Sequence, residues 1–183
     1  MKILFLDRDG VINVDHGHVS KISDFKFMDG IFELCKYYIN NDYSIIIVTN
    51  QTGIGLGLYR LEDFLKVNNY MLSEFKKEGI TILDVFYCPH NPSEECECRK
   101  PKPKMFFLAR DKYDIDLSNS IMIGDKITDA QGAHNAGIKN IYLINNDEEL
   151  DFEVKRIKSL LEVIKWDTLV QMALEEKLIQ NLL

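Results

Sequence analysis

The sequence predicts an α/β protein in which helices cover both faces of a parallel β-sheet. Short apolar runs alternate with segments of helical periodicity through most of the chain, the order of elements typical of this class. The runs are almost wholly apolar, as expected for strands buried on both faces. A chain of 183 residues, 46% of them hydrophobic, is also long and apolar enough to bury one substantial core.

Five strands and four helices are expected. Apolar runs predict strands at residues 3–6, 44–48, 81–87, 120–123 and 140–144. Apolar residues at helical spacing predict helices at residues 31–41, 61–78, 104–113 and 127–136. Gly30 and Pro103 precede two of these helices, and Gly79 and Gly137 end the other two. Cys35 lies on the apolar face of the first helix, where we expect a buried small hydrophobic residue.

The tail from about residue 154 onward is predicted to be purely helical, because its apolar residues form one stripe. The stripe comprises Val154, Ile157, Leu160, Leu161 and Ile164, and past Trp166-Asp167 it continues with Leu169, Val170, Met172, Ala173, Leu178, Ile179, Leu182 and Leu183. Such a helix can pack on its own core or on a second chain. We expect the former, within a single domain over residues 1–183 of a monomeric protein, and residues 154–183 as its C-terminal helical segment.

Charge and composition exclude several classes of protein. The net charge of -7 argues against a nucleic-acid groove, which needs a basic surface. No apolar stretch approaches the roughly 20 residues of a membrane span. The apolar segment before Asp7 is too short for a signal peptide. We therefore expect a cytoplasmic protein with neither a nucleic-acid nor a membrane partner.

Carboxylates, hydroxyls and basic groups follow four of the predicted strands. Because the carboxyl ends of parallel strands meet at one edge of the sheet, these side chains are expected to converge on one crevice. They are Asp7 and Asp9 after the first strand, Thr49, Asn50 and Gln51 after the second, Arg99 and Lys100 after an excursion from the third, and Asp125 and Asp129 after the fourth. Each motif alone is weak, but their joint occurrence in this order indicates a functional site. Asp129 is open to two interpretations, as part of this site or as a solvated residue of its helix.

The expected chemistry is phosphoryl transfer to a carboxylate. Asp7 is ionised at pH 7 and can attack phosphorus without a base to activate it. A phosphate beside this carboxylate is repelled by about 4 kcal/mol per unit-charge pair at about 4 Å and an effective dielectric of about 20. Mg²⁺ bridging Asp7, Asp125 and a phosphate oxygen would reverse the sign of that interaction, because this cation prefers oxygen ligands.

The other residues supply charge, hydrogen bonds and a proton. Lys100 can add positive charge at the phosphoryl oxygens, and a Thr49 hydroxyl and an Asn50 backbone N–H can hold the group in line. Thr49 and Asn50, together with Gln51, are the expected substrate-binding residues after the second strand. Asp9 lies two residues beyond the nucleophile on the same side of an extended chain, where it can protonate the leaving alcohol and later deprotonate water.

Three cysteines and a histidine crowd into one short segment, Cys88-x-His90 and Cys96-x-Cys98. Three thiolates and an imidazole form the closed tetrahedral ligand set of structural zinc. The alternative is a surface loop of reduced cysteines. We favour zinc, because the segment lacks apolar residues to form a core of its own and crowded thiols otherwise invite oxidation. Zinc would position the two basic residues that directly follow Cys98.

Four motifs resemble those of the haloacid-dehalogenase-type phosphatases. They are Asp7-Arg8-Asp9-Gly10-Val11-Ile12-Asn13, Thr49-Asn50-Gln51-Thr52-Gly53-Ile54, the segment from Cys88 to Pro103, and Gly124-Asp125-Lys126. More narrowly, residues 3 to 144 resemble the D-glycero-D-manno-heptose 1,7-bisphosphate 7-phosphatase group, which is related to the histidinol-phosphate phosphatases. The resemblance implies a Rossmann-like core without a large cap domain, and Mg²⁺-dependent hydrolysis of a sugar phosphate through an aspartyl-phosphate.

The resemblance also implies roles for individual residues. Asp7 would be the nucleophile and Asp9 the acid and base. Asp7, the carbonyl of Asp9 and Asp125 would bind Mg²⁺, whereas Arg99 and Lys100 would contact the substrate. The substrate would be a heptose bisphosphate that loses its 7-phosphate.

Two positions depart from the pattern of the heptose group. Leu56 stands where an arginine is usual and His18 where an aromatic residue is expected, which affects contacts with the sugar.

Histidinol phosphate or another small phosphomonoester is the alternative substrate, although nothing in the sequence indicates a site for its imidazole. A non-enzymatic phosphoacceptor module would not need Asp9. A zinc-dependent nucleic-acid binder is disfavoured by the acidic composition.

Overall fold

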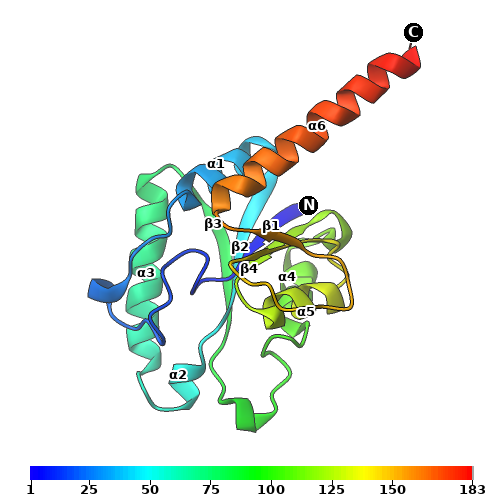
Figure 1. Cartoon of the computed structure of the whole chain (residues 1–183). Coiled ribbons are helices and arrows are strands. Elements are labelled where there is room, and N and C mark those ends of the chain that lie inside the picture. Colours follow the sequence, from blue (N-terminus) through cyan, green and yellow to red (C-terminus); the bar gives the residue numbers. More distant parts are fainter. Residues whose placement is uncertain (183) are drawn as a thin grey trace.

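Six parallel strands form one sheet in the order β3-β2-β1-β4-β5-β6 (Figure 1). The computed structural model describes residues 1–182, without the side chains of residues 171 and 174–182. The strands are β1 (Lys2–Leu6), β2 (Tyr43–Asn50), β3 (Ile82–Cys88), β4 (Ile121–Gly124), β5 (Asn140–Ile144) and β6 (Lys155–Ile157). The chain extends the sheet first on one side of β1 and then on the other, so residues from both halves meet at the C-terminal end of β1.

Helices cover both faces of this sheet, which confirms the predicted fold class. On one face lie α1 (Ile31–Asn40), α3 (Leu61–Lys77) and the start of α6 (Leu160–Leu182), and on the other lie α4 (Lys104–Tyr113) and α5 (Ile127–Asn135). The connections contain the short helix α2 (Thr52–Gly55) and the 3-10 turns η1 (Ile22–Asp24), η2 (Pro92–Glu94) and η3 (Leu117–Asn119). All nine predicted elements are present, with boundaries within two residues of those expected.

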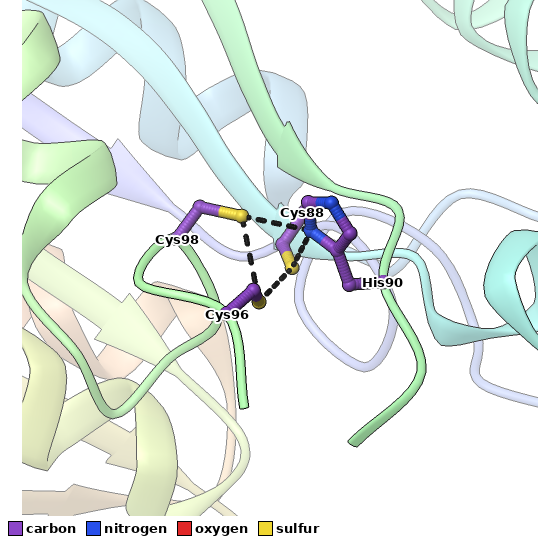
Figure 2. A group of neighbouring side chains, drawn as sticks. All are labelled: Cys88, His90, Cys96 and Cys98. Atoms are coloured by element: carbon purple, nitrogen blue, oxygen red, sulfur yellow. Dashed lines mark hydrogen bonds between the residues drawn. The ribbon is translucent and has the colours of Figure 1, made fainter. Parts of the chain in front are cut away.

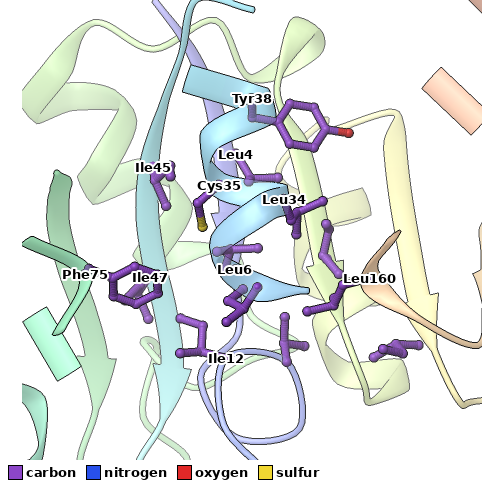
Figure 3. Packing of buried hydrophobic residues seen from close by; sticks show 14 of the residues in the cluster. Leu4, Leu6, Ile12, Leu34, Cys35, Tyr38, Ile45, Ile47, Phe75 and Leu160 are labelled. Carbon is purple, nitrogen blue, oxygen red and sulfur yellow. The ribbon is translucent and has the colours of Figure 1, made fainter. Parts of the chain in front are cut away.

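Each face of the sheet has its own apolar core. The first contains Leu6 of β1 together with Cys35 of α1 and Phe75 of α3 (Figure 3). On the opposite face, the ring of Phe5 meets that of Phe106 edge-on, with 5.2 Å between the centroids. Successive residues of one strand therefore enter different cores, which explains why the strands are continuous apolar runs. Cys35 is fully buried, as predicted, and burial raises the pKa of its thiol to about 12.

The prediction of a purely helical tail from residue 154 is wrong. Residues Lys155–Ile157 form β6, which pairs in parallel with β5 and places Lys155 opposite Tyr142. The helix begins only at Leu160. A three-residue strand with one buried side chain, Ile157, carries too little pattern to be separated from the helical stripe. The open edge of β5, and not the local sequence, makes this segment a strand.

Among the described side chains of α6, those in its first part pack on the core, so the expected packing is met there. Leu160 and Val163 are buried, and Asp167 accepts hydrogen bonds of 2.5 Å from the hydroxyls of Tyr38 and Tyr142. Beyond this point the helix projects away from the rest of the molecule (Figure 1). The exposed apolar side chains of α6 on either side of Asp167 include Trp166, Leu169, Val170 and Met172. The predicted continuation of the stripe through Leu178, Ile179, Leu182 and Leu183 lies outside the described side chains.

Among the described residues, no helix has both the length and the apolar character needed to cross a bilayer.

Candidate active site

Three carboxylates and one lysine form a buried charged cluster at the C-terminal edge of the sheet. Asp7 directly follows β1, Asp125 directly follows β4, and Asp129 lies in the first turn of α5. One carboxylate oxygen from each lies within 4.8 Å of the others. Nζ of Lys100, which is only 2% exposed, lies 2.8 Å from Oδ1 of Asp7 and 2.6 Å from Oδ1 of Asp129, and donates to the Val48 carbonyl. We refer to Asp7, Asp125 and Asp129 as the carboxylate cluster.

Asp129 combines the two arrangements that the sequence left open. Its Oδ1 faces Lys100, whereas its Oδ2 accepts the backbone N–H of Lys126 at 3.0 Å and so caps α5. The approach is very close, because a Cβ built on Gly124 would lie 2.3 Å from the Cβ of Asp129. Only glycine at the end of β4 permits this contact.

The carboxylate cluster fits a hard divalent cation. Oδ1 of Asp125 is buried and has no hydrogen-bond partner among the described residues. A buried carboxylate oxygen without a partner is costly, and a cation would satisfy it. Gly10 has a φ of +93°, and a Cβ there would lie 2.3 Å from Oδ2 of Asp125, so glycine is needed for both conformation and space. The three carboxylates offer several oxygen atoms, which are the ligands that Mg²⁺ prefers.

Burial and like charge shift the protonation of the cluster. Burial raises the pKa of Asp7 to about 7 despite the neighbouring Lys100, and the other two carboxylates add to the rise. Burial and then Asp129 raise the pKa of Asp125 to about 6. Burial opposes the charge of Lys100 as well, but Asp129 and Asp7 raise the pKa of its ammonium above the ordinary value. Three carboxylates thus face a single ammonium, and a divalent cation would favour the ionised form of Asp7 and Asp125.

Asp9 is held by donors from three side chains. Arg8 contacts both carboxylate oxygens, Nε reaching Oδ2 at 3.1 Å and Nη2 reaching Oδ1 at 2.9 Å. Asn13 donates to Oδ1 and Gln51 donates to Oδ2, each at 3.0 Å. Arg8 is itself fully buried and also donates to the Val19 carbonyl. These contacts fix the carboxylate of Asp9 on the wall of the same cavity that Asp7 lines.

The residues at the end of β2 are placed differently from one another. Oγ1 of the buried Thr49 accepts a hydrogen bond of 2.9 Å from Gln51. The side chain of Asn50 binds the backbone of Lys100 twice, since Nδ2 donates to its carbonyl at 3.1 Å and Oδ1 accepts its N–H at 3.0 Å. We predicted a role for the backbone N–H of Asn50, and this side-chain clamp on Lys100 was not anticipated.

A polar cavity of about 310 Å³ opens at the carboxylate cluster. Its lining includes all of the predicted catalytic and substrate-binding residues except Thr49, namely Asp7, Asp9, Asn50, Gln51, Arg99 and Lys100. At the rim, the guanidinium of Arg99 donates to the Thr52 hydroxyl, and Nζ of Lys126 lies 3.1 Å from Asp15. Cationic groups on the rim of a polar cavity suit a small anionic substrate.

The four zinc-ligand candidates lie together, Cys88 at the end of β3 and the other three in the loop that follows (Figure 2). The Sγ atom of Cys88 is 3.5 Å from both Nδ1 of His90 and Sγ of Cys96. Sγ of Cys98 lies 3.1 Å from Nδ1 of His90 and 3.6 Å from Sγ of Cys96. Tetrahedral zinc with its usual bond lengths separates such ligand atoms by about 3.5 to 3.8 Å. The spacing of the four atoms is therefore close to that of a tetrahedral zinc site.

Sequence reasoning missed the buried residues that support Asp9. Arg8 lies inside the first motif, but nothing local shows that its guanidinium turns inward. Tyr59 donates its hydroxyl proton to Oε1 of Gln51 at 2.7 Å and also lines the cavity. Gly53 was the available clue, because a Cβ there would lie 2.1 Å from the Tyr59 ring. A glycine indicates a close neighbour without saying which residue it is.

Comparisons with known proteins agree with this geometry. Residues 97–152 match the HAD-hydrolase-like family. A D-glycero-alpha-D-manno-heptose-1,7-bisphosphate 7-phosphatase of Campylobacter jejuni is 47% identical over 165 residues, which cover 90% of this chain and 95% of the relative. A D-glycero-beta-D-manno-heptose-1,7-bisphosphate 7-phosphatase of Helicobacter pylori is 42% identical over 167 residues, which cover 90% of this chain and 96% of the relative.

The fold is also similar to a solved structure from this group. A D,D-heptose 1,7-bisphosphate phosphatase from B. bronchiseptica, complexed with magnesium and phosphate, matches with a TM-score of 0.84 and 28% sequence identity. The match covers 94% of this chain and 99% of that chain. The likeness therefore extends over nearly the full length of both proteins.

Proposed function

Because the chain belongs to the D-glycero-D-manno-heptose-1,7-bisphosphate 7-phosphatase family of HAD-like hydrolases, we propose that it removes the 7-phosphate of this sugar with Mg²⁺ as cofactor. The observation that carries the proposal is the buried carboxylate cluster beside Lys100. Asp7 and Asp9 line one polar cavity, so a nucleophile and a proton donor reach the same bound molecule.

In the first half-reaction, Asp7 attacks the phosphorus atom of the 7-phosphate. Lys100 binds Oδ1 of Asp7, and within the described part of the chain no hydrogen bond reaches Oδ2, which is the attacking atom. The bond from Oδ2 to phosphorus forms while the bond from phosphorus to the sugar oxygen breaks. Asp9 gives a proton to the departing sugar oxygen, which leaves an aspartyl-phosphate and a free hydroxyl on the sugar.

In the second half-reaction, water removes the phosphoryl group from Asp7. Asp9, now a carboxylate, accepts a proton from the water as its oxygen bonds to phosphorus. The bond between phosphorus and Oδ2 breaks, which restores the Asp7 carboxylate and releases inorganic phosphate. Lys100 and the Thr49 hydroxyl hold the phosphoryl oxygens during both steps.

Mg²⁺ is assigned to Asp7, Asp125 and the backbone carbonyl of Asp9, with Asp129 in the same cluster. The buried, unpartnered Oδ1 of Asp125 supports this assignment. The bound ion supplies positive charge that offsets the repulsion between the carboxylates and the phosphoryl group.

Zn²⁺ is assigned to Cys88, His90, Cys96 and Cys98, in support of the loop that leads to the basic pair Arg99-Lys100. Three cysteines without disulfide partners at these spacings, together with a histidine nitrogen, support the assignment. We place the protein in the cytoplasm, because a reducing compartment keeps such thiols available for metal.

The test is hydrolysis by the purified full-length protein in the presence of Mg²⁺. Both anomers of the heptose 1,7-bisphosphate, histidinol phosphate and a set of small phosphomonoesters are compared. We expect the highest kcat/KM with a heptose bisphosphate, and phosphorus NMR that shows loss of the 7-phosphate and retention of the 1-phosphate. A higher kcat/KM with histidinol phosphate would assign the alternative substrate, and absence of hydrolysis would refute the proposal.

A further inference from the structure

A chain of three hydrogen bonds connects a buried tyrosine to two residues of the active site. The hydroxyl of Tyr59 donates to Oε1 of Gln51 at 2.7 Å. Nε2 of Gln51 then donates twice, to Oδ2 of Asp9 at 3.0 Å and to Oγ1 of Thr49 at 2.9 Å. Tyr59 and Gln51 are both at least nine-tenths buried, so water does not readily replace these bonds.

The direction of this chain follows from which groups can donate. Oδ2 of Asp9 also accepts a hydrogen bond from Nε of Arg8, so it is an acceptor here; the amide nitrogen of Gln51 must face it and the amide oxygen must point away. That oxygen needs a donor of its own, and the Tyr59 hydroxyl supplies one. With the amide reversed, two acceptors would meet at Asp9 and the favourable contact would become a repulsive one.

The same chain sets the direction of the Thr49 hydroxyl. Its Oγ1 already accepts an N–H of Gln51. The hydroxyl proton of Thr49 therefore points away from Gln51, and the proposed function directs it to a phosphoryl oxygen. A single amide thus orients both Asp9 and the Thr49 hydroxyl, the two groups to which the proposed function gives roles in the transfer.

The position of Tyr59 is built into the backbone. It lies in the turn after α2, where its N–H and that of Leu58 both bind the Gly53 carbonyl. The missing side chain of Gly53 provides the space for the tyrosine ring. The ring is therefore wedged in place, and its hydroxyl is presented to Gln51 at low entropic cost.

We propose that Tyr59 is a positioning residue of the reaction, acting through Gln51 to orient both Asp9 and Thr49. This inference rests on the proposed function, because it assigns Asp9 and Thr49 their roles in phosphoryl transfer. Tyr59 itself needs no contact with the phosphoryl group. Its effect should therefore fall on turnover, not on binding of the ground state.

The test is the variant Tyr59→Phe, which keeps the ring against Gly53 and removes only the hydroxyl. We expect kcat for the heptose bisphosphate to fall about tenfold, the factor that corresponds to one lost hydrogen bond in the transition state, with KM changed by less than about twofold. The pH profile of kcat should also move, because the environment of Asp9 changes. An unchanged kcat and pH profile would overturn the proposal.

A double-mutant cycle separates action through Gln51 from a general effect on folding. Gln51→Leu should lower kcat, and adding Tyr59→Phe to it should produce no further fall. If the two effects multiply instead, Tyr59 does not act through Gln51. Tyr38→Phe is the matched control, because it removes a buried tyrosine hydroxyl bonded to Asp167 and should leave kcat and the pH profile unchanged.

The cycle also separates this inference from the proposed function. If the unmodified protein fails to hydrolyse the heptose bisphosphate, the proposed function is wrong. If it hydrolyses the sugar and Tyr59→Phe does so equally well, only the inference about Tyr59 is wrong.

Discussion

The two groups of side chains that could hold a metal ion are built in opposite ways. The carboxylate cluster draws Asp7, Asp125 and Asp129 from β1, β4 and α5, so it exists only when the whole sheet has formed. The Cys/His cluster comes from residues 88–98, which comprise the last residue of β3 and the loop that follows it. The first is assembled by topology and the second by local spacing. We therefore expect loss of the first metal to stop the chemistry without unfolding the protein, and loss of the second to disorder a loop.

The largest expected effect is at Asp7, the proposed nucleophile. Asp7→Asn should lower turnover by about 10³-fold or more, because an amide oxygen cannot form the aspartyl-phosphate. The fold should survive, since the sheet does not depend on this side chain for its core. Hydrolysis of a phosphate ester and circular dichroism measure the two properties. Near-normal hydrolysis by a folded variant would show that Asp7 is not the nucleophile.

The next largest effect is expected at Asp9, the proposed proton donor. Asp9→Asn should slow both half-reactions by about 10² to 10⁴-fold, the range typical of a lost general acid or base. Because the second step also needs a base, phosphorylated protein should accumulate. Mass spectrometry of the quenched reaction, which detects the added phosphoryl group, measures this. Asp151→Asn, at an exposed position before β6, is a control that should accumulate none.

A smaller effect is expected at the Cys/His cluster. Cys96→Ser should yield protein without zinc and raise KM for the heptose bisphosphate by about tenfold, because Arg99 loses its support. Lys100 should stay in place, since the Asn50 clamp holds it independently of the loop. Hydrolysis of a minimal phosphate ester should therefore persist.

Metal analysis of protein purified without chelator checks the first part of this prediction, and kinetics check the second. Cys35→Ala is the matched control, because Cys35 is buried in the core and should leave the zinc content unchanged. A zinc-free unmodified protein would contradict the zinc assignment.

The smallest expected effect is on the free energy of unfolding of the metal-free protein, and it concerns Asp125 of the carboxylate cluster. Burial raises the pKa of Asp125 to about 6 from 3.8, so its contribution to stability is full below about pH 3.8 and is lost as the pH rises through 6. At pH 7.5 the charged side chain therefore destabilises the metal-free protein. Asp125→Asn should stabilise that form by on the order of 1 to 3 kcal/mol.

Thermal melts with chelator present measure this difference, which should shrink as the pH falls toward 4. In Mg²⁺ the order should reverse, because only the unmodified protein gains stability from the bound ion. A variant less stable than the unmodified protein at pH 7.5 without metal would show that the charge of Asp125 does not destabilise the metal-free protein.

Parts of both clusters could be predicted from the sequence. The strand ends were recognisable because apolar runs stop at Asp7 and at Gly124, and the sheet rule then placed their side chains on one edge. The zinc candidates were recognisable because all four lie within one short segment. The role of Asn50 was not recognisable, because its partner is the backbone of a residue fifty positions away.

The amino-acid sequence alone determined the class of fold, the residues at the strand ends and the Cys/His cluster, since each is recorded in a local pattern of polarity or spacing. Tertiary structure alone decided that residues 155–157 are a strand, that Asp129 pairs with Lys100, and that Arg8 and Tyr59 support Asp9. The physical reason is that these contacts depend on which surfaces the assembled sheet buries against one another. A polar contact that is weak when exposed to water becomes strong when it is buried, and no local sequence pattern records which contacts will be buried.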